Sequence, residues 1–357
     1  MGNNKVSLKD IAKKINTTPA TVSRALNNKP GVSEELREQI TRVANEMGYI
    51  PNVMAREIRA DKRNILVLFP NKDYNSRFYT DLLWKGYERA KAEFNILQVE
   101  WFELYLDEED LTKSNKLKAE KLGEYIASGI EFDGVIIYQA GYYKPLFSAI
   151  KKFKENNIPV IAIHKVMEEL EYTSLITDDA YRIGKLAAEM LYKFDKNQKQ
   201  ILLVENSEDS FFGKDETSQG FQDEIFRLFP DITIKKIDQF SPDLLDFCSD
   251  VLSDENTTGL FGTTARSGIF LSKIVEINKW QNSFFHIITG LNDNSKEALR
   301  KGYVKCIIDN HPEREGVEAV RELFNILIYE KEPVKLQKVP LRILFESNLD
   351  DIDDNYD

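Results

Sequence analysis

Cysteine, histidine and long apolar runs are scarce in this chain of 357 residues. Its two cysteines, Cys248 and Cys306, lie far apart without metal-ligand spacing, so neither a disulfide framework nor a zinc site is expected. No apolar run approaches the roughly 20 residues that span a bilayer, which argues against a membrane helix. Residues Met1 to Lys5 lack the charged and apolar regions of a signal peptide, so we expect a cytoplasmic protein.

The motifs of common enzyme classes are missing as well. The sequence contains no dinucleotide-binding glycine loop, no phosphate-binding loop and no HExxH zinc motif. Its three histidines, His164, His286 and His311, stand apart from one another. We therefore expect a binding protein rather than an enzyme, with no cofactor and no metal ion.

Charge is distributed unevenly along the chain. The net charge is −11, but residues 1–63 carry 12 Lys and Arg against 7 Asp and Glu, a net charge of +5. The remainder carries 36 against 52, a net charge of −16. Because an acidic surface repels the phosphate backbone, any contact with nucleic acid is expected at the first 63 residues only.

The first 50 residues are expected to form three short helices. Each begins after a residue whose side-chain oxygen can cap the first turn: Ser7, Thr18 and Ser33. Pro19 stands at the first position of the second helix, where its missing N–H costs nothing. The apolar positions of that helix face a small core, so its outer face is left with Ala20, Thr21, Ser23 and Arg24. This is the layout of a helix that reads DNA, although three small helices without a DNA role would share the pattern.

A close resemblance to the LacI/GalR family of transcriptional repressors is carried by the run SLKDIAKKINTTPATVSRALNNKPGVSEELREQITRVANEMGYIPNVMAREIRA. The resemblance implies an all-α helix-turn-helix head that binds double-stranded, pseudo-palindromic operator DNA as a homodimer. Position by position, it implies that Pro19, Ala20 and Arg24 read the major groove. It implies phosphate contacts for Thr18, Thr21, Ser23 and Asn27. Arg24 can form two hydrogen bonds with guanine, whereas Pro19 and Ala20 offer apolar contact alone.

Residues 51–63 resemble the hinge helix and linker of the same family, which enter the minor groove. Ala55 and Arg56 lie in this segment, and Ile58 stands where the family usually has a leucine wedge. An apolar wedge unstacks base steps and bends the duplex. An ordinary linker helix is the alternative.

Residues 64–347 alternate short apolar runs with helical stretches, which is typical of parallel βα units. Strands are expected at 65–69, 96–102, 135–138, 160–163, 201–204, 233–237, 259–261, 285–289 and 306–308. Helices are expected at 78–94, 109–129, 144–157, 181–194, 218–229, 242–254, 267–278, 295–301 and 314–329. The resemblance implies an α/β effector-binding and dimerisation domain of the periplasmic-binding-protein type I, with two doubly wound parallel-sheet subdomains. It places the chain crossings near 165–175, 290–295 and 310–345, and it leaves 348–357 as an acidic tail.

Ligands of doubly wound sheets bind beyond the carboxyl ends of the strands. The candidate effector-binding residues after the strands of the first half are Asp73, Tyr74, Arg77, Phe78, Tyr138, Gln139, His164 and Lys165. Those of the second half are Asp178, Phe212, Thr217, Phe240, Thr263, Arg266, Asn292 and Asn310. Aromatic faces with amides and a few charges suit a sugar, although any single member can be a solvated loop residue.

Several positions depart from the family pattern. Thr217 replaces a common arginine anchor, Thr263 and Thr264 replace an Asn-Asp pair, and Asn292 replaces an aspartate. Arg266, together with Arg77 and Lys165, can supply cationic donors, so we expect a sugar acid or sugar phosphate, with a neutral oligosaccharide as the alternative.

The resemblance predicts a repressor of carbohydrate-metabolism genes that a sugar-type effector releases from DNA. A regulator that binds DNA only when liganded, and a sugar receptor without a DNA role, are the alternatives. Because the acidic tail lacks a leucine heptad, we expect a dimer rather than a tetramer.

Overall fold

The computed structural model describes residues 6–26, 29–47, 62–71, 77–105, 111–138, 143–165, 169–206, 215–280 and 283–350. The chain divides into two compact units, a first unit of residues 1–62 and 96–98 and a second unit of the remaining residues.

The first unit contains the three helices that the sequence predicts: α1 (Leu8–Lys14), α2 (Pro19–Leu26) and α3 (Glu34–Glu46). The turn between α1 and α2 depends on Asn16, whose φ of 55° lies in the left-handed region that asparagine tolerates. There the backbone N–H of Thr17 donates to the carbonyl of Ala12 at 2.8 Å, which closes the end of α1.

A small apolar core holds these helices together. Its buried members are Ile11, Ala12, Val22, Ala25, Ile40, Val43 and Ala44. The Arg37 guanidinium of α3 donates to the carbonyl of Ala25 at 2.8 Å and to that of Lys29 at 3.1 Å. The first of these bonds satisfies a carbonyl at the end of α2 that helix geometry leaves without a partner, and the second holds the chain that follows α2. The orientation of α2 is therefore set by apolar packing and by one arginine.

The second unit contains two six-stranded sheets, called sheet A and sheet B here. Sheet A has the strand order β11-β5-β4-β3-β1-β2. These strands are β1 (Arg63–Leu68), β2 (Val99–Leu104), β3 (Gly134–Tyr138), β4 (Val160–Ile163), β5 (Ser174–Thr177) and β11 (Leu336–Lys338). All of their pairings are parallel, with Leu66 opposite Phe102 on one side and Val135 on the other.

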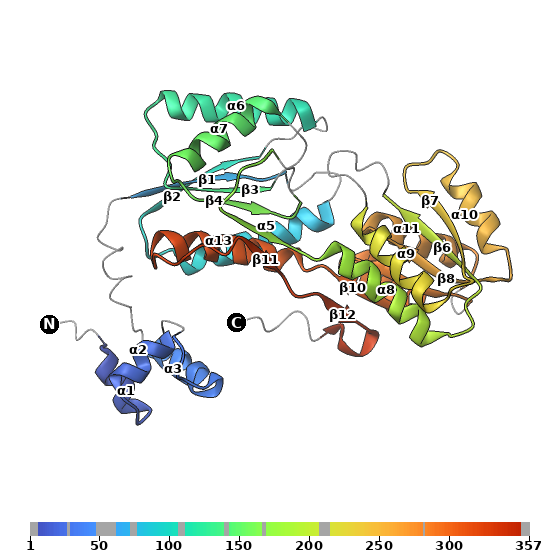
Figure 1. Ribbon diagram of the computed structural model, residues 1–357, viewed down its shortest axis with the longest axis horizontal. Helices are drawn as coiled ribbons and strands as arrows, with labels where there is room; N and C mark the ends of the chain where they lie inside the picture. The colour runs from blue at the N-terminus through green and yellow to red at the C-terminus, as the bar shows by residue number, and fades with distance from the viewer. Residues whose placement is uncertain are drawn as a thin grey trace. The chain divides into compact units, whose positions relative to one another are not determined.

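Helices cover both faces of sheet A (Figure 1). α6 (Leu111–Ala127) and α7 (Lys144–Glu155) pack on one face through a core that includes Leu66, Val135 and Ile150. α5 (Arg77–Glu93) and α13 (Pro312–Leu327) cover the other face. Because both faces are buried, the central strands read as nearly continuous apolar runs.

Sheet B has the strand order β12-β10-β9-β8-β6-β7. Its strands are β6 (Gln200–Glu205), β7 (Thr233–Asp238), β8 (Thr257–Gly262), β9 (Phe285–Thr289), β10 (Cys306–Asp309) and β12 (Arg342–Leu344). β12 runs antiparallel to β10, and the other pairings are parallel. Its helices are α8 (Ala180–Phe194), α9 (Glu216–Leu228), α10 (Leu244–Leu252), α11 (Ala265–Ile277) and α12 (Asp293–Arg300), and the 3-10 helix η1 spans Glu346–Asn348.

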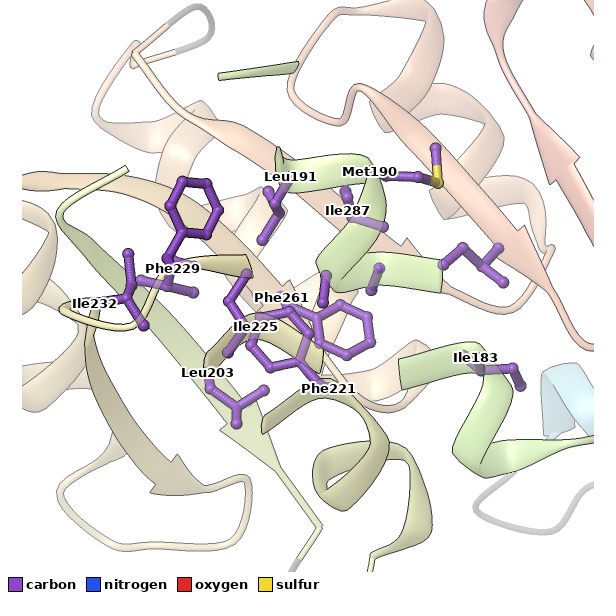
Figure 2. Close-up of a cluster of buried hydrophobic side chains, with 14 of the residues drawn as sticks. Ile183, Met190, Leu191, Leu203, Phe221, Ile225, Phe229, Ile232, Phe261 and Ile287 are labelled. Atoms are coloured by element: carbon purple, nitrogen blue, oxygen red, sulfur yellow. The ribbon is translucent and has the colours of Figure 1, made fainter. Parts of the chain in front are cut away.

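The core between α8, α9 and sheet B is rich in phenylalanine and isoleucine. Figure 2 shows Phe221 and Ile225 of α9 directed toward Leu203 and Phe261 of the sheet. The rings of Phe221 and Phe261 stack with centroids 4.9 Å apart. A second core on the opposite face joins α10 and α11 to Leu202 and Leu260. Adjacent residues of one strand thus serve different cores, as the two-residue period of a strand requires.

Two helix pairs cross through glycines at very short separation. A Cβ built on Gly184 of α8 would lie 2.0 Å from the carbonyl oxygen of Thr217 in α9, and one on Gly220 would lie 2.0 Å from that of Tyr181. A Cβ built on Gly86 of α5 would lie 1.8 Å from the carbonyl oxygen of Glu313 in α13. Only glycine permits this close an approach of two backbones.

The predicted fold class is confirmed, and all nine expected strands and nine expected helices are found, two strands (160–163 and 285–289) with the expected ends and the other elements with shifted ends. Three strands were missed, namely β5, β11 and β12. They are short and lie at or beside sheet edges, where a three- or four-residue run carries little periodic signal.

One of the expected crossings is wrong. The chain leaves sheet A after β5, at residues 178–179, close to the expected 165–175, because β5 adds a strand beside β4. Residues 290–295 contain no crossing, since they join β9 and β10, which are neighbours in sheet B. Two crossings lie within the expected 310–345 segment, one before α13 and one between β11 and β12. Among the described helices, none combines the length and the apolar character that a membrane span requires.

Candidate functional site

The outer face of α2 is the candidate DNA interface of the first unit. Val22 and Ala25 are buried, whereas Pro19, Ala20 and Arg24 are exposed. Pro19 and Ala20 are small and apolar, so Arg24 is the only long polar side chain among the three residues that are predicted to read the major groove. The structure therefore places the three predicted readers on one solvent-facing surface.

The first turn of α2 is fixed by its own hydroxyls. The Thr18 hydroxyl accepts a hydrogen bond from the Thr21 N–H at 3.1 Å and lies 2.9 Å from the Thr21 hydroxyl. Thr18 is thus the N-cap that the sequence predicts. The positive end of the helix dipole at this terminus favours phosphate. Ser23 is half-buried on the same helix. Asn27 and the hinge candidates Ala55, Arg56 and Ile58 lie outside the described residues.

The carboxyl edge of sheet A gathers three aromatic rings. Tyr138 ends β3 and His164 follows β4, and their rings stack 8° from parallel with centroids 5.7 Å apart. The ring of Tyr79, from the first turn of α5, lies 4.7 Å from that of His164. The φ of His164 is 69°, and its N–H donates to the carbonyl of Ile176 at 2.8 Å. Burial, and then the charge of Lys165, lowers the pKa of the His164 imidazole to about 3. The ring is therefore neutral at physiological pH.

Two buried carboxyl groups lie beside these rings. Asp178 follows β5, and Glu315 lies in the first turn of α13 with no exposed surface. Burial raises the pKa of Glu315 well above its usual value, and the nearby Asp178 carboxyl raises it further. Burial also raises the pKa of Asp178, against a hydrogen bond that its Oδ2 accepts from Asn310 Nδ2 at 2.9 Å. The Tyr79 hydroxyl donates to Glu315 Oε2. Two predicted residues, Asp178 and Asn310, are thus in direct contact.

Sheet B brings together a different set at its carboxyl edge. Arg266, in the first turn of α11, lies over the Phe240 ring with its guanidinium carbon 5.4 Å from the ring centroid. Both side chains are exposed. A planar cation held on a ring can donate two hydrogen bonds to a carboxylate or phosphate. Among the predicted cationic residues Arg77, Lys165 and Arg266, Arg266 therefore lies in contact with another predicted pocket residue, Phe240.

Several predicted pocket residues have structural partners. The buried Thr263 hydroxyl donates to Asp215 Oδ2 at 2.7 Å, and Asp215 also caps α9 by accepting from Ser218 N–H at 3.0 Å. Asn292 caps α12 by accepting from Ser295 N–H at 3.0 Å, and its Nδ2 has no partner among the described residues. Thr217 is buried where α8 and α9 cross. These side chains position the helices that begin at this edge.

The remaining candidates are placed only in part. Lys165 is half-buried after β4. Arg77 and Phe78 begin α5, and their side chains are outside what the structure describes. Asp73, Tyr74, Gln139 and Phe212 also lie outside the described residues.

Sequence reasoning missed Tyr79 and Glu315. Both lie inside predicted helices, whereas the candidate residues were expected directly after the carboxyl ends of predicted strands. A signal for Glu315 does exist, because it shares a helix face with the buried residues Ala319 and Leu323. An acidic residue on an apolar stripe is rarely buried without a partner.

Comparisons with known proteins identify both units. Residues 7–52 match the family model described as bacterial regulatory proteins, lacI family. Residues 67–331, more than half of the chain, match the model of a periplasmic binding protein domain. The chain belongs to the lacI family of bacterial regulatory proteins.

Curated relatives of this lacI-family chain are similar over part of their length. It is 26% identical over 219 residues to the probable HTH-type transcriptional repressor ExuR of Bacillus subtilis (strain 168), which covers 60% of this chain and 59% of that protein. The chain thus spans about three fifths of the length of that relative.

Solved structures show the same fold. A putative LacI transcriptional regulator from Bacteroides fragilis has a TM-score of 0.66 at 18% identity and covers 81% of this chain and 99% of that one. GanP, a glucose-galactose binding protein from Geobacillus stearothermophilus, has a TM-score of 0.64 at 17% identity, with coverage of 81% and 99%. These similarities establish the architecture of the second unit, and its ligand is a separate question.

Proposed function

We propose that this lacI-family chain is a DNA-binding transcriptional regulator that acts in the cytoplasm as a homodimer. The observation that carries the proposal is the exposed α2 surface of Pro19, Ala20 and Arg24 on a head that matches the lacI family model. The net charge of +5 over residues 1–63, against −16 for the rest, favours contact with DNA by the head alone. No catalytic role is proposed, because the family comprises regulatory proteins.

Arg24 is the residue on which sequence readout depends in this proposal. Arg24→Ala should reduce discrimination by about 1–3 kcal/mol at one base pair per half-site. Arg42→Ala is the matched control, because Arg42 is an exposed arginine of α3 in the same head. The measurement is the affinity of both variants for an operator selected from random duplexes and for its single-base variants. An equal loss on every sequence would make Arg24 a phosphate contact.

The hinge segment 51–59 is proposed to enter the minor groove, with Ala55 and Arg56 on the DNA and Ile58 as the wedge. Ile58→Ala should reduce DNA bending in a gel-phasing assay while the protein stays folded. Unchanged bending would refute the wedge.

The second unit is proposed to bind a sugar-type effector at the facing carboxyl edges of its sheets. Stacked rings at Tyr138 and His164, the Asp178–Asn310 hydrogen bond and the Arg266–Phe240 pair are the groups that suit sugar rings and hydroxyls. A glucose-galactose binding protein of the same fold supports the ligand class. The Arg266 guanidinium favours a sugar acid or a sugar phosphate.

A thermal-shift screen against neutral sugars, uronates and sugar phosphates tests the ligand class, since a ligand of the folded state raises its Tm. We expect an anionic hit whose shift is lost in Arg266→Ala and kept in Arg300→Ala, which removes an exposed arginine that pairs with Asp350. If only neutral sugars raise the Tm, the proposal that the effector is a sugar acid or sugar phosphate is wrong.

We propose that the effector releases the protein from operators of carbohydrate-metabolism genes. Ligand-driven closure of the subdomains would shift the population of the DNA-competent dimer. The alternative is a regulator that binds DNA only when liganded. Footprinting with and without the effector separates them, because tighter binding with ligand contradicts release.

A further inference from the structure

Three potential metal ligands meet at the carboxyl edge of sheet A. His164, Asp178 and Glu315 each offer one ligand atom, and these atoms all lie within 4.8 Å of one another. They come from the end of β4, the segment after β5 and the first turn of α13. His164 and Asp178 lie 14 positions apart and Glu315 lies far along the chain from both, so only the fold brings the three together.

Two atoms of this cluster are buried without a partner. Glu315 Oε1 and His164 Nδ1 have no hydrogen-bond partner in the described part of the chain. Glu315 has no exposed surface at all. A fully buried oxygen acceptor that faces another carboxyl group and an imidazole needs a proton or a cation between them.

The second oxygen of each carboxyl group is already held by a neutral donor. The Tyr79 hydroxyl donates to Glu315 Oε2, and Asn310 Nδ2 donates to Asp178 Oδ2 at 2.9 Å. Donors of this kind orient metal-binding carboxylates and leave one oxygen of each directed elsewhere. A shared proton would need no imidazole, whereas a metal ion uses all three groups.

We propose that His164, Asp178 and Glu315 bind one divalent transition-metal ion, of the Zn²⁺, Mn²⁺ or Co²⁺ type. One imidazole nitrogen with two carboxylates suits these ions, whereas Mg²⁺ and Ca²⁺ prefer oxygen ligands throughout. The sequence predicts no metal site, because these three ligands do not have the short spacing of a metal-binding motif.

Three protein ligands leave at least one coordination position for another oxygen. Where the second unit binds a sugar acid, that position takes a carboxylate or hydroxyl oxygen of the effector, and the metal charge offsets the two acidic side chains. This second step rests on the proposed function, whereas the metal site does not.

Metal binding can be measured on the untagged full-length protein, without DNA or sugar. After chelation and dialysis, Co²⁺ is titrated while visible absorption is recorded, and bound Zn²⁺ and Mn²⁺ are counted by mass spectrometry. We expect one equivalent and no stoichiometric binding of Mg²⁺. Absence of stoichiometric binding by the wild-type protein overturns the proposal.

Variants then locate the ion. His164→Asn and Glu315→Gln should each weaken Co²⁺ binding at least tenfold, and Tyr79→Phe should weaken it 10- to 100-fold through the lost hydrogen bond to Glu315. Glu322→Gln is the matched control, since Glu322 is a buried glutamate of α13 that accepts from Ser174 and Val334. Circular dichroism verifies folding, and a variant that unfolds is replaced by Asp178→Asn. Unchanged binding in folded ligand variants overturns the assignment.

The dependence on the effector is measured last. Affinity for a uronate should fall at least tenfold in metal-free protein, while binding of operator DNA by the unliganded dimer should not. Equal uronate affinity with and without metal refutes the shared position and leaves the metal site standing. Failure of DNA binding would refute the proposed function alone.

Discussion

The glycine crossing of α8 and α9 offers a sharp test of how the second unit is packed. A Cβ on Gly184 would lie 2.0 Å from the Thr217 carbonyl oxygen and 2.5 Å from the Phe221 N. Non-bonded carbon atoms prefer separations of about 3.5–4.0 Å, so Gly184→Ala must push the helices roughly 1.5 Å apart. The clashing atoms belong to the backbone and cannot rotate away.

The expected loss of stability combines two opposing effects. Overpacking costs about 1–3 kcal/mol when side chains can adjust. Replacing glycine by alanine inside a helix contributes about 1 kcal/mol in the favourable direction. Because displacing α9 also disturbs the contact of Phe221 with Phe261, we expect a net loss of about 2 kcal/mol for Gly184→Ala.

The same chain supplies a control of opposite sign. Gly123 lies inside α6 and is exposed, and a Cβ built on it meets nothing within 4 Å. Gly123→Ala should therefore raise the free energy of unfolding by about 0.5–1 kcal/mol through helix propensity alone. Urea unfolding followed by circular dichroism measures both variants. A Gly184→Ala protein as stable as the wild type would show that the crossing is wider than described.

Three further predictions follow from buried or capped groups. Burial lowers the pKa of His286 to about 4, below the unfolded value of about 6.5, so its stabilising contribution is complete above pH 6.5. As the pH falls from 6.5 to 4 we expect that contribution to drop by about 3 kcal/mol, a part of the pH dependence of unfolding that His286→Asn should lack. Arg342→Met leaves the fully buried Asp309 without its ion-pair partner and should cost about 3–5 kcal/mol in urea unfolding, with partial recovery when Asp309→Asn is added. Thr18→Ala removes the cap that Thr21 N–H uses and should lower the protection of α2 amides in hydrogen exchange by about 0.5–2 kcal/mol, whereas unchanged protection would show that water replaces the cap.

Much of the fold could be predicted because its information is local. The caps Thr18 and Ser33, the helical period of the head and the apolar runs of β1 and β4 are all carried by neighbouring residues. The expectation that binding residues follow the carboxyl ends of strands also selected two pairs that are in contact, Tyr138 with His164 and Asp178 with Asn310. The short strands β5, β11 and β12 were not predicted, because their formation depends on pairing with residues elsewhere in the chain.

The candidate site could be predicted only in part from the sequence, for the same reason. Thr263 and Asn292 follow strands, as a ligand-binding residue would, yet their oxygens hold Asp215 and Ser295. Side chains after a strand can bind a ligand or fix the next helix, and local sequence does not distinguish the two roles.

The sequence by itself determined the two-part organisation, the family and the charge contrast between the head and the rest, since these depend on composition, periodicity and an unbroken run of positions. Only the tertiary structure decided where the chain crosses between sheets, which helices cross through glycine, and that Glu315 meets His164 and Asp178. Such contacts join residues separated by many positions, and chain folding rather than local pattern sets their distances.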